Sequence, residues 1–503
     1  MPLAPAPIFP GTSPLPPAGT RPPSRSALRI AALISVPLLL VLLVLGQVTL
    51  PWVAFIGPGL EAQAGGTDPG AHGAPFQGFV YWWTRRMPSS SSAGFSSPAS
   101  LANLKLQAQT FHMNAVIIPV VADMPYRSDS IISWDSSDPT TGKYNLDTFP
   151  DATYAQVIQD ARSVGLMPVL ELVVRQQSPL SKTASGIDES AELVGRAWDV
   201  PSTQSYGNEI PGQPRLSVRD TERAWFDSYT AFAVHYAELS AKYSLPYFII
   251  GDQLSSVTTD DSHTDRKGDP SGIDSGLTTD PFINTCAGRR DCGWRHIVNA
   301  IKSPTYGTYI GQKASTGASY NGKLIYAADW GPTGTPEYEG ITWWDAVDYI
   351  GIDAYFPLTA GLSDIGVQDL SDIWHGQGAN ASPAGDIFGG LGKIADQYFR
   401  PVLFTSAGYE SVPGSNASPG SSPAADADQT EQLNDMEGLQ LTFNSAPWWV
   451  GVFWYDEEPL TPHSAQTNWT TSTAWASDDL SSSKLAGQWL AHYYQPNPLP
   501  CSC

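Results

Sequence analysis

The stretch AWFDSYTAFAVHYAELSAKYSLPYFIIGDQL, residues Ala224–Leu254, contains the two elements from which the fold can be predicted. Its first part, Ala224–Lys242, carries aromatic and aliphatic side chains at helical spacing and predicts an amphipathic helix. Its second part, Tyr247–Gly251, is a short apolar run rich in aromatic and β-branched residues, which is typical of a buried strand. A helix followed closely by a buried strand is the repeating unit of a parallel sheet covered by helices.

The same alternation extends over most of the 503 residues. We predict further helices at Gln429–Phe443 and Ser482–His492, and eight strands at Gly78–Trp82, Ala115–Val121, Met167–Val173, Tyr247–Gly251, Lys323–Ala328, Tyr349–Asp353, Pro401–Thr405 and Val450–Trp454. Eight strand–helix repeats indicate an α/β fold, the (β/α)8 TIM barrel, whose functional residues lie at the carboxyl ends of the strands. Four polar insertions are expected as loops at that end, Gln176–Asp220, Ser256–Cys292, Thr359–Gly392 and Ser411–Asp428.

The composition excludes one class of partner. The net charge is -22 and only 15% of the residues are charged. A nucleic-acid-binding surface needs a basic face against the phosphates, so nucleic acid is not an expected partner. Neutral glycans are compatible with this composition.

The amino-terminal region predicts a membrane anchor. Ile30–Leu50 carries no charge and is long enough to span a bilayer. Arg21, Arg25 and Arg29 precede it, whereas the first acidic residue of the chain is Glu61. This bias predicts a cytoplasmic amino terminus and a single-pass protein of the cell membrane, with the remaining chain outside the cytoplasm.

The chain is accordingly divided into a Pro-rich cytoplasmic tail (1–29), a signal-anchor (30–50), a linker (51–76), the barrel (77–495) and a carboxyl-terminal tail (496–503). The alternative is a cleaved signal peptide, because Ala62-Gln63-Ala64 has the small-x-small pattern of a cleavage site. Both interpretations place the barrel outside the cytoplasm.

The four cysteines fit an exported protein. Cys286 and Cys292 flank a short Arg-rich segment and are predicted to form a disulfide, whereas Cys501 and Cys503 end the chain. Neither a zinc-ligand pattern nor a phosphate-binding glycine loop is present in the sequence, so we expect no metal and no cofactor.

Two predicted strand ends carry the functional signal, FIIGDQL at Phe248–Leu254 and PVLFTSAGY at Pro401–Tyr409. Together with WWDAVDYIGIDAYFPL at Trp343–Leu358, they resemble segments of glycoside hydrolase family 113, a family of retaining β-mannanase-type barrels. In that family the first segment carries the general acid/base glutamate and the second the nucleophilic glutamate. The resemblance implies that Gln253 and Ser406 occupy these two positions.

Neither residue supports the retaining mechanism, which needs two carboxyl groups about 5–5.5 Å apart. The amide of Gln253 has no proton to donate, and the hydroxyl of Ser406 is a weak nucleophile without an adjacent base. Losing acid/base assistance alone costs on the order of 10²–10⁴ in rate. The resemblance therefore predicts a barrel that has lost this chemistry.

Other acids lie near the same strand ends. Asp252, Glu171 and Glu410 are candidates for a relocated catalytic pair. Asp353, within IGIDAY, is expected to orient its neighbours, as the resemblance implies. The alternative for all of these acids is hydrogen bonding to loops or to sugar hydroxyls.

Aromatic residues at strand ends suit saccharide binding, because the C–H faces of sugars pack on aromatic rings. The resemblance implies that Trp454 is a sugar platform and that Tyr355 supports the nucleophile position, and Trp82 and Trp330 are further candidates. Core packing is the alternative for each aromatic residue.

Three functional hypotheses remain from the sequence. The first is a membrane-anchored barrel that binds a polysaccharide or cell-wall glycan without the retaining mechanism. The second is an active glycosidase that uses relocated carboxyl groups. The third is a non-catalytic scaffold whose inserted loops contact another protein.

Overall fold

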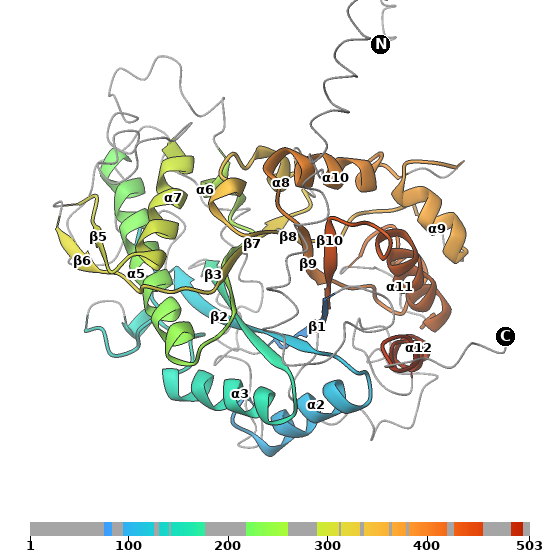
Figure 1. Ribbon diagram of the computed structural model, residues 1–503, viewed down its shortest axis with the longest axis horizontal. Coiled ribbons are helices and arrows are strands. Elements are labelled where there is room, and N and C mark those ends of the chain that lie inside the picture. The colour runs from blue at the N-terminus through green and yellow to red at the C-terminus, as the bar shows by residue number, and fades with distance from the viewer. Residues whose placement is uncertain are drawn as a thin grey trace, which may run out of the picture. The chain divides into compact units, whose positions relative to one another are not determined.

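A closed barrel of eight parallel strands forms the centre of the protein (Figure 1). The computed structural model describes residues 75–82, 94–124, 130–139, 142–176, 218–259, 289–310, 313–331, 336–361, 365–378, 382–419, 427–455 and 484–495. The barrel strands are β1 (Phe76–Val80), β2 (Ala115–Met124), β3 (Met167–Gln176), β4 (Tyr247–Asp252), β7 (Lys323–Asp329), β8 (Tyr349–Asp353), β9 (Val402–Ala407) and β10 (Trp449–Trp454). Their order around the barrel is β1-β10-β9-β8-β7-β4-β3-β2, with β1 paired to both β2 and β10. The predicted (β/α)8 barrel is confirmed.

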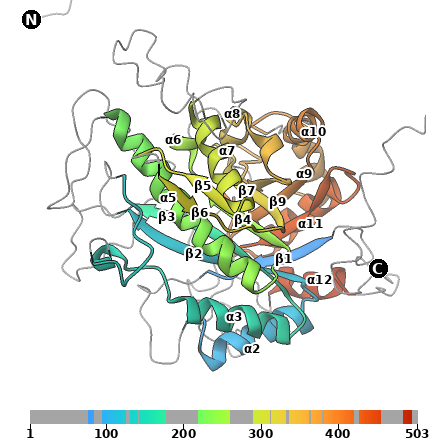
Figure 2. The same cartoon turned by 60° about the vertical axis from the view of Figure 1, so that its left-hand side comes forward.

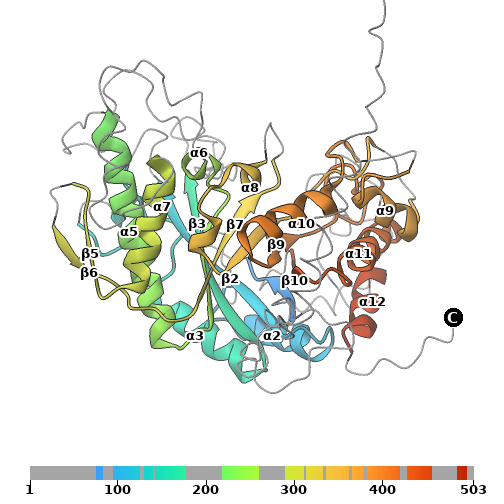
Figure 3. The ribbon, with the colours of Figure 1, turned by 45° about the horizontal axis from the view of Figure 1, so that its top comes forward.

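Helices surround the strands. They are α2 (Pro98–Gln109), η2 (Gly142–Tyr144), α3 (Asp151–Ser163), α5 (Val218–Lys242), α6 (Ser255–Thr258), α7 (Arg289–Lys302), α8 (Glu337–Gly340), η4 (Trp344–Ala346), α9 (Val367–Trp374), α10 (Ile387–Tyr398), α11 (Gln429–Phe443) and α12 (Leu485–Tyr493). Figure 2 shows α5 and α7 side by side on the outside of the barrel. Figure 3 shows α9, α11 and α12 grouped on the other side of the strands.

Some predicted loops contain helical residues instead. Ser256–Cys292 includes most of α6 and the start of α7. The insertion Thr359–Gly392 includes α9 and the first residues of α10. Leu370, Ile373 and Trp374 of α9 are buried, at the spacing of one helix face. This apolar face packs against α11 and outweighs the polar and glycine-rich composition of the insertion.

The hairpin of β5 (Thr305–Gly307) and β6 (Ala314–Thr316) was not predicted. It lies outside the barrel sheet, and its turn is held by α5. The carboxylate of Asp227 accepts hydrogen bonds from the backbone N–H groups of Tyr309 and Ile310, both at 2.7 Å.

Aromatic rings fill the amino-terminal end of the barrel interior. The ring of Phe76 lies 5.0 Å from Tyr247, 6.1 Å from Tyr349 and 5.9 Å from Phe453, measured between centroids. These four rings come from β1, β4, β8 and β10. Because this end is filled by side chains, ligand access is expected only from the carboxyl-terminal end.

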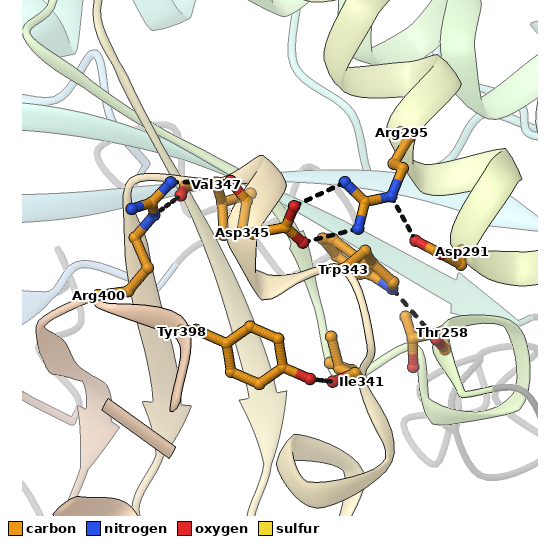
Figure 4. A network of polar contacts seen from close by, with 9 residues as sticks. All are labelled: Thr258, Asp291, Arg295, Ile341, Trp343, Asp345, Val347, Tyr398 and Arg400. Atoms are coloured by element: carbon orange, nitrogen blue, oxygen red, sulfur yellow. Dashed lines mark hydrogen bonds and ion pairs between the residues drawn. The ribbon is translucent and has the colours of Figure 1, made fainter. Parts of the chain in front are cut away.

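A polar network on the outside holds the connection between β7 and β8 (Figure 4). The guanidinium of Arg295 on α7 donates to both carboxylate oxygens of Asp345, at 2.9 and 2.6 Å, and to Asp291 at 2.6 Å. Arg400, which follows α10, donates to the backbone carbonyls of Asp345 and Val347. The network therefore joins α7, η4 and the end of α10.

The predicted membrane anchor Ile30–Leu50 lies outside the described residues, as does Cys286. Within the described part of the chain, no helix is long and apolar enough to cross a membrane. Cys292 is disulfide-bonded, and its predicted pairing with Cys286 stays a prediction.

Candidate functional site

Acidic side chains from neighbouring strands meet at the carboxyl-terminal end of the barrel. Asp353 lies on the same face of β8 as Tyr349, whose ring is inside the barrel, because side chains two residues apart in a strand share a face. Glu171 of β3, Asp252 of β4 and Asp329 of β7 are also buried near this end. Glu171 and Asp252 interact electrostatically with Asp353, so three carboxyl groups from β3, β4 and β8 meet at this end.

Asp353 receives hydrogen bonds from both sides. Its Oδ2 accepts from Nε2 of Gln253 at 2.8 Å, and its Oδ1 accepts from Oγ1 of Thr405 at 2.9 Å. The side chain of Asp252 also hydrogen-bonds to Asp353. Asp353 is only 2% exposed, so these contacts stabilise a buried charge. This geometry agrees with its predicted role of orienting neighbours.

Glu171 and Asp252 retain their protons far more readily than ordinary carboxyl groups. They are 5% and 7% exposed, respectively. Burial, and next the charge of Asp353, raise the pKa of each well above its usual range. Burial also raises the pKa of Asp353, but the hydrogen bonds from Asp252, Gln253 and Thr405 oppose this rise. Asp353 is therefore the ionised member of the group, and Asp252 donates a proton to it.

Gln253 is held in an unusual backbone conformation. Its φ is +48°, a left-handed conformation that is uncommon for residues other than glycine. Its backbone N–H donates to the carbonyl of Ala327 at 2.9 Å, and its side-chain N–H donates to Asp353. The amide oxygen Oε1 of Gln253 and Oδ1 of Asp252 are buried without a hydrogen-bond partner in the described structure. The two adjacent residues both face Asp353, although strand alternation alone predicts different directions for them.

Ser406 lies on the other side of Asp353, next to Tyr355. The hydroxyl groups of Ser406 and Tyr355 are 2.6 Å apart, and either can donate. The ring of Tyr355 makes an edge contact with Tyr455, with centroids 6.3 Å apart. Ser406, Tyr355 and Tyr455 are all partly exposed. The structure thus brings Tyr355 and Ser406 together as the sequence interpretation implied.

The predicted aromatic residues are distributed differently from expectation. Trp82 lies beside Val121 and Val173, with the guanidinium of Arg175 4.8 Å from its ring centroid. Trp330 is partly exposed and its ring makes a tilted contact with Phe356 at 6.1 Å. Trp82 therefore packs beside residues of β2 and β3, and Trp330 packs toward Phe356 in the segment after β8.

Trp454 is a correction to the sequence interpretation. It is 1% exposed, and its indole N–H donates to the hydroxyl of Tyr494, beside α12, at 3.1 Å. The side chain of Trp454 therefore points out of the barrel, toward α12. The next residue, Tyr455, points inward and contacts Tyr355. Trp454 offers no ring face to a ligand in this structure.

Sequence reasoning missed Thr405, Arg175, Tyr455 and the buried Glu337. Thr405 and Tyr455 adjoin residues that were named, but the sequence does not show that Thr405 reaches Asp353 or that Tyr455 contacts Tyr355. Glu337 lies in a segment without a strand or helix pattern strong enough to predict. Glu410, in the segment after β9, is partly exposed and remains a candidate acid.

The arrangement offers hydroxyl groups, an amide and protonated carboxyl groups around one charge. Such groups hydrogen-bond a polyhydroxylated ligand, and a carboxyl group with a raised pKa can also donate a proton in catalysis. Among the described residues, no group of three or more His, Cys, Asp or Glu side chains is arranged to hold a metal ion.

Comparison with known proteins agrees with this geometry. The model of Glycoside Hydrolase Family 113 matches residues 286–471, a range that includes Asp353, Tyr355 and Ser406 but not Gln253. No curated protein matches the chain.

Among solved structures, a β-1,4-mannanase of family 113 superposes with a TM-score of 0.53 and 17% identity, covering 84% of this chain and 98% of the mannanase. The β-mannanase AaManA from Alicyclobacillus acidocaldarius, in complex with ManMIm, superposes with a TM-score of 0.54 and 18% identity, covering 84% and 97%. At these identities the likeness shows the fold. The family match and the barrel geometry together identify the chain as a glycoside-hydrolase-like (β/α)8 barrel that resembles family 113.

Proposed function

We propose that the protein is a membrane-anchored, extracytoplasmic barrel that binds a glycan, and that the retaining mechanism of family 113 is lost. The observation that carries the proposal is the neutral chemistry at two strand ends. Gln253 follows β4, the fourth barrel strand along the chain, and Ser406 lies on β9, the seventh. Both side chains hydrogen-bond to residues of β8 or its extension, Asp353 and Tyr355.

The hydrogen-bonding groups and aromatic rings of the site support glycan binding. Gln253 donates its N–H group to Asp353, and its amide oxygen is buried without a donor, a deficit that the hydroxyl of a ligand entering the site would fill. The hydroxyl groups of Ser406 and Tyr355 can each donate or accept. The aromatic rings of Tyr355 and Tyr455 add surfaces suited to sugar C–H groups. The solved mannanases make β-1,4-linked mannan oligosaccharides the first ligands to test.

A second candidate function is hydrolysis by relocated acids. The observation that favours it is the raised pKa of Glu171 and of Asp252, caused first by burial, since a glycosidase acid must hold its proton near neutral pH. Asp353 supplies an ionised carboxylate in the same group.

One titration separates the two functions. The full chain, purified in a mild detergent, is titrated with β-1,4-mannohexaose by calorimetry, and the same samples are analysed for shortened products by chromatography. Binding without products supports the glycan-binding function, and products that disappear in Asp252→Asn or Glu171→Gln support hydrolysis. No binding to mannan, glucan or cell-wall oligosaccharides would contradict both.

Variants test the position of the site. Gln253→Ala is expected to weaken binding about tenfold, because it removes an amide that contacts the ligand and Asp353. Gln156→Ala is the matched control, since Gln156 is exposed on α3 and bonds only locally to Asp160. Equal affinities of both variants and the parent protein would contradict the placement.

The anchor is tested separately. Deletion of residues 1–50 is expected to move the protein from the membrane pellet to the supernatant after cell lysis. A full chain that is found in the supernatant would contradict the anchor without affecting the glycan-binding proposal.

A further inference from the structure

The segment immediately after Gln253 is held by contacts from outside. α6, Ser255–Thr258, has no side-chain cap at its amino terminus. Instead, the backbone N–H of Leu254 donates to the hydroxyl of Tyr326 at 2.9 Å. The indole N–H of Trp294 donates to the carbonyl of Val257 at 3.0 Å. Neighbouring elements, rather than the helix itself, therefore hold the left-handed turn at Gln253.

The carboxylate of Glu337 accepts three hydrogen bonds that connect the elements around this segment. Its Oε1 accepts from Oγ1 of Thr258 at 2.5 Å and from the hydroxyl of Tyr326 at 2.6 Å. Its Oε2 accepts from the backbone N–H of Asp329 at 2.8 Å. One carboxylate thus joins α6, α8 and the end of β7, and through Tyr326 it reaches the backbone of Leu254.

The orientation of the Tyr326 hydroxyl depends on this carboxylate. Because Tyr326 donates its proton to Glu337, its oxygen lone pairs are available to the N–H of Leu254. All three groups bonded to Glu337 are donors, so the ionised carboxylate, which has acceptor sites only, binds them most strongly. A protonated Glu337 carries a donor of its own and accepts more weakly, so protonation weakens the three hydrogen bonds.

Glu337 is poised to change its charge near neutral pH. It is 2% exposed. Burial raises the pKa of Glu337 to about 7, against the hydrogen bonds from Asp329, Thr258 and Tyr326. The titratable groups around it are Asp329, whose charge opposes its ionisation, and Asp252, which retains its proton. Arg290 of α7 donates to the carbonyl of Thr259.

We propose that Glu337 is a positioning residue, whose ionised carboxylate holds the ends of β4 and β7 so that Gln253 and Asp329 keep their places, and whose protonation loosens both. It contacts no ligand in this role and acts through Tyr326, Thr258 and the backbone of Asp329. The structural part of the inference stands on the hydrogen bonds alone. The expected pH dependence of glycan affinity rests in addition on the proposed function.

Hydrogen exchange of the full chain without ligand tests the structural part. Protection factors, which correct for the pH dependence of exchange itself, are measured for the amides of Leu254 and Asp329 from about pH 5.5 to about pH 8.5. Both are expected to fall roughly tenfold as pH drops through the pKa of Glu337, since each amide depends on this network. Glu337→Gln is expected to give low protection over the whole range. The exposed Glu339→Gln on the same short helix is the control and should behave as the parent protein.

A second variant identifies the titrating group. Thr258→Val keeps the shape of the side chain but removes a hydrogen bond that stabilises the charged form of Glu337. The midpoint of the change is therefore expected at higher pH than in the parent protein. The inference would be overturned if the midpoint in Thr258→Val equalled that of the parent protein, or if protection in the parent protein did not vary with pH. This test does not require that Glu337→Gln folds.

Mannohexaose titrations over the same pH range separate this inference from the proposed function. The parent protein is expected to bind about tenfold more tightly above the midpoint than below it, and the midpoint in Thr258→Val is expected to shift. Absence of binding together with the expected exchange behaviour would reject the glycan-binding function and retain the role of Glu337.

Discussion

At the scale of single residues, Asp353 organises the barrel end. It accepts hydrogen bonds from Gln253 and Thr405, and its side chain is also hydrogen-bonded to that of Asp252. This arrangement explains how three buried carboxyl groups coexist, because Glu171 and Asp252 remain protonated while Asp353 carries the charge. Which of these groups can donate a hydrogen bond to a ligand therefore depends on the protonation state of each carboxyl group as well as on the residue type.

The double substitution Gln253→Glu with Ser406→Glu is expected to create β-mannosidic hydrolysis. A carboxyl group introduced at Gln253 would face the charge of Asp353, which raises its pKa as a general acid requires. One introduced at Ser406 would meet the hydroxyl of Tyr355, which can stabilise a nucleophilic carboxylate. Product release from mannohexaose measures the gain, with each single variant as control. A double variant that folds and binds but stays inert would contradict the assigned positions.

The variant Asp252→Asn tests the protonation of the buried group. A carboxyl group whose pKa is raised on folding stabilises the protein fully below its unfolded-state pKa, and the contribution is lost as pH rises toward the folded-state pKa. Asparagine mimics the protonated side chain and donates to Asp353 without titrating. Asp252→Asn should therefore be more stable than the parent protein at alkaline pH, by about 1.4 kcal/mol for each unit of pKa elevation.

Urea unfolding at about pH 5 and about pH 8 measures this difference. The control is Asp396→Asn, at an exposed position on α10. Equal pH dependence in Asp252→Asn and the parent protein would show that Asp252 does not hold a proton in the folded state.

At the scale of elements, backbone conformation at the ends of strands and helices decides where side chains point. The left-handed turn at Gln253 ends β4 and directs both Asp252 and Gln253 toward β8. The same conformation ends α10, where Phe399 has φ +53° and its N–H donates to the carbonyl of Ala395. At Gln253 the turn builds the site, whereas at Phe399 it only ends a helix.

Phe399→Gly is expected to stabilise the protein by about 0.5–1 kcal/mol, because glycine adopts the left-handed helix end without strain. Phe399 is 71% exposed, so little packing is lost. The free energy of unfolding in urea measures the change. Phe399→Ala is the control, since it removes the ring and keeps the strain, and a gain as large in Phe399→Ala would contradict this explanation.

At the scale of the whole molecule, closure of the barrel depends on the pairing of β1 with β10. Gly451 is paired with Phe76 and has φ +131°. A Cβ atom at this position would lie 2.0 Å from the backbone oxygen of Phe76. The close approach of the first and last strands therefore requires glycine here.

Gly451→Ala is expected to lower the free energy of unfolding by roughly 3 kcal/mol or more, since it adds a clash to backbone strain. Gly361→Ala separates the two causes, because Gly361 also has a positive φ of 105° but no atom lies within 4 Å of its added Cβ. Urea unfolding compares the two variants. Similar losses in both would contradict a specific role of Gly451 in closure.

The sequence also predicted most of the barrel. All eight strands were placed correctly to within a few residues, because buried parallel strands are short apolar runs flanked by helical patterns. The same strand ends placed Gln253, Asp353, Tyr355 and Ser406 at one end of the barrel. These features depend on local composition and on the order of elements, which the chain itself carries.

Only the tertiary structure decided the directions of the side chains. Phe453 lies inside the barrel, so strand alternation turns Trp454 outward and Tyr455 inward, and the sequence does not show which of these neighbouring aromatic residues faces the interior. The protons on Glu171 and Asp252 likewise depend on burial and on the nearby charge of Asp353, which lies about a hundred or more residues away along the chain. Sequence therefore determined the scaffold and the residue types at its functional end, whereas packing between distant segments decided their orientation and their charge.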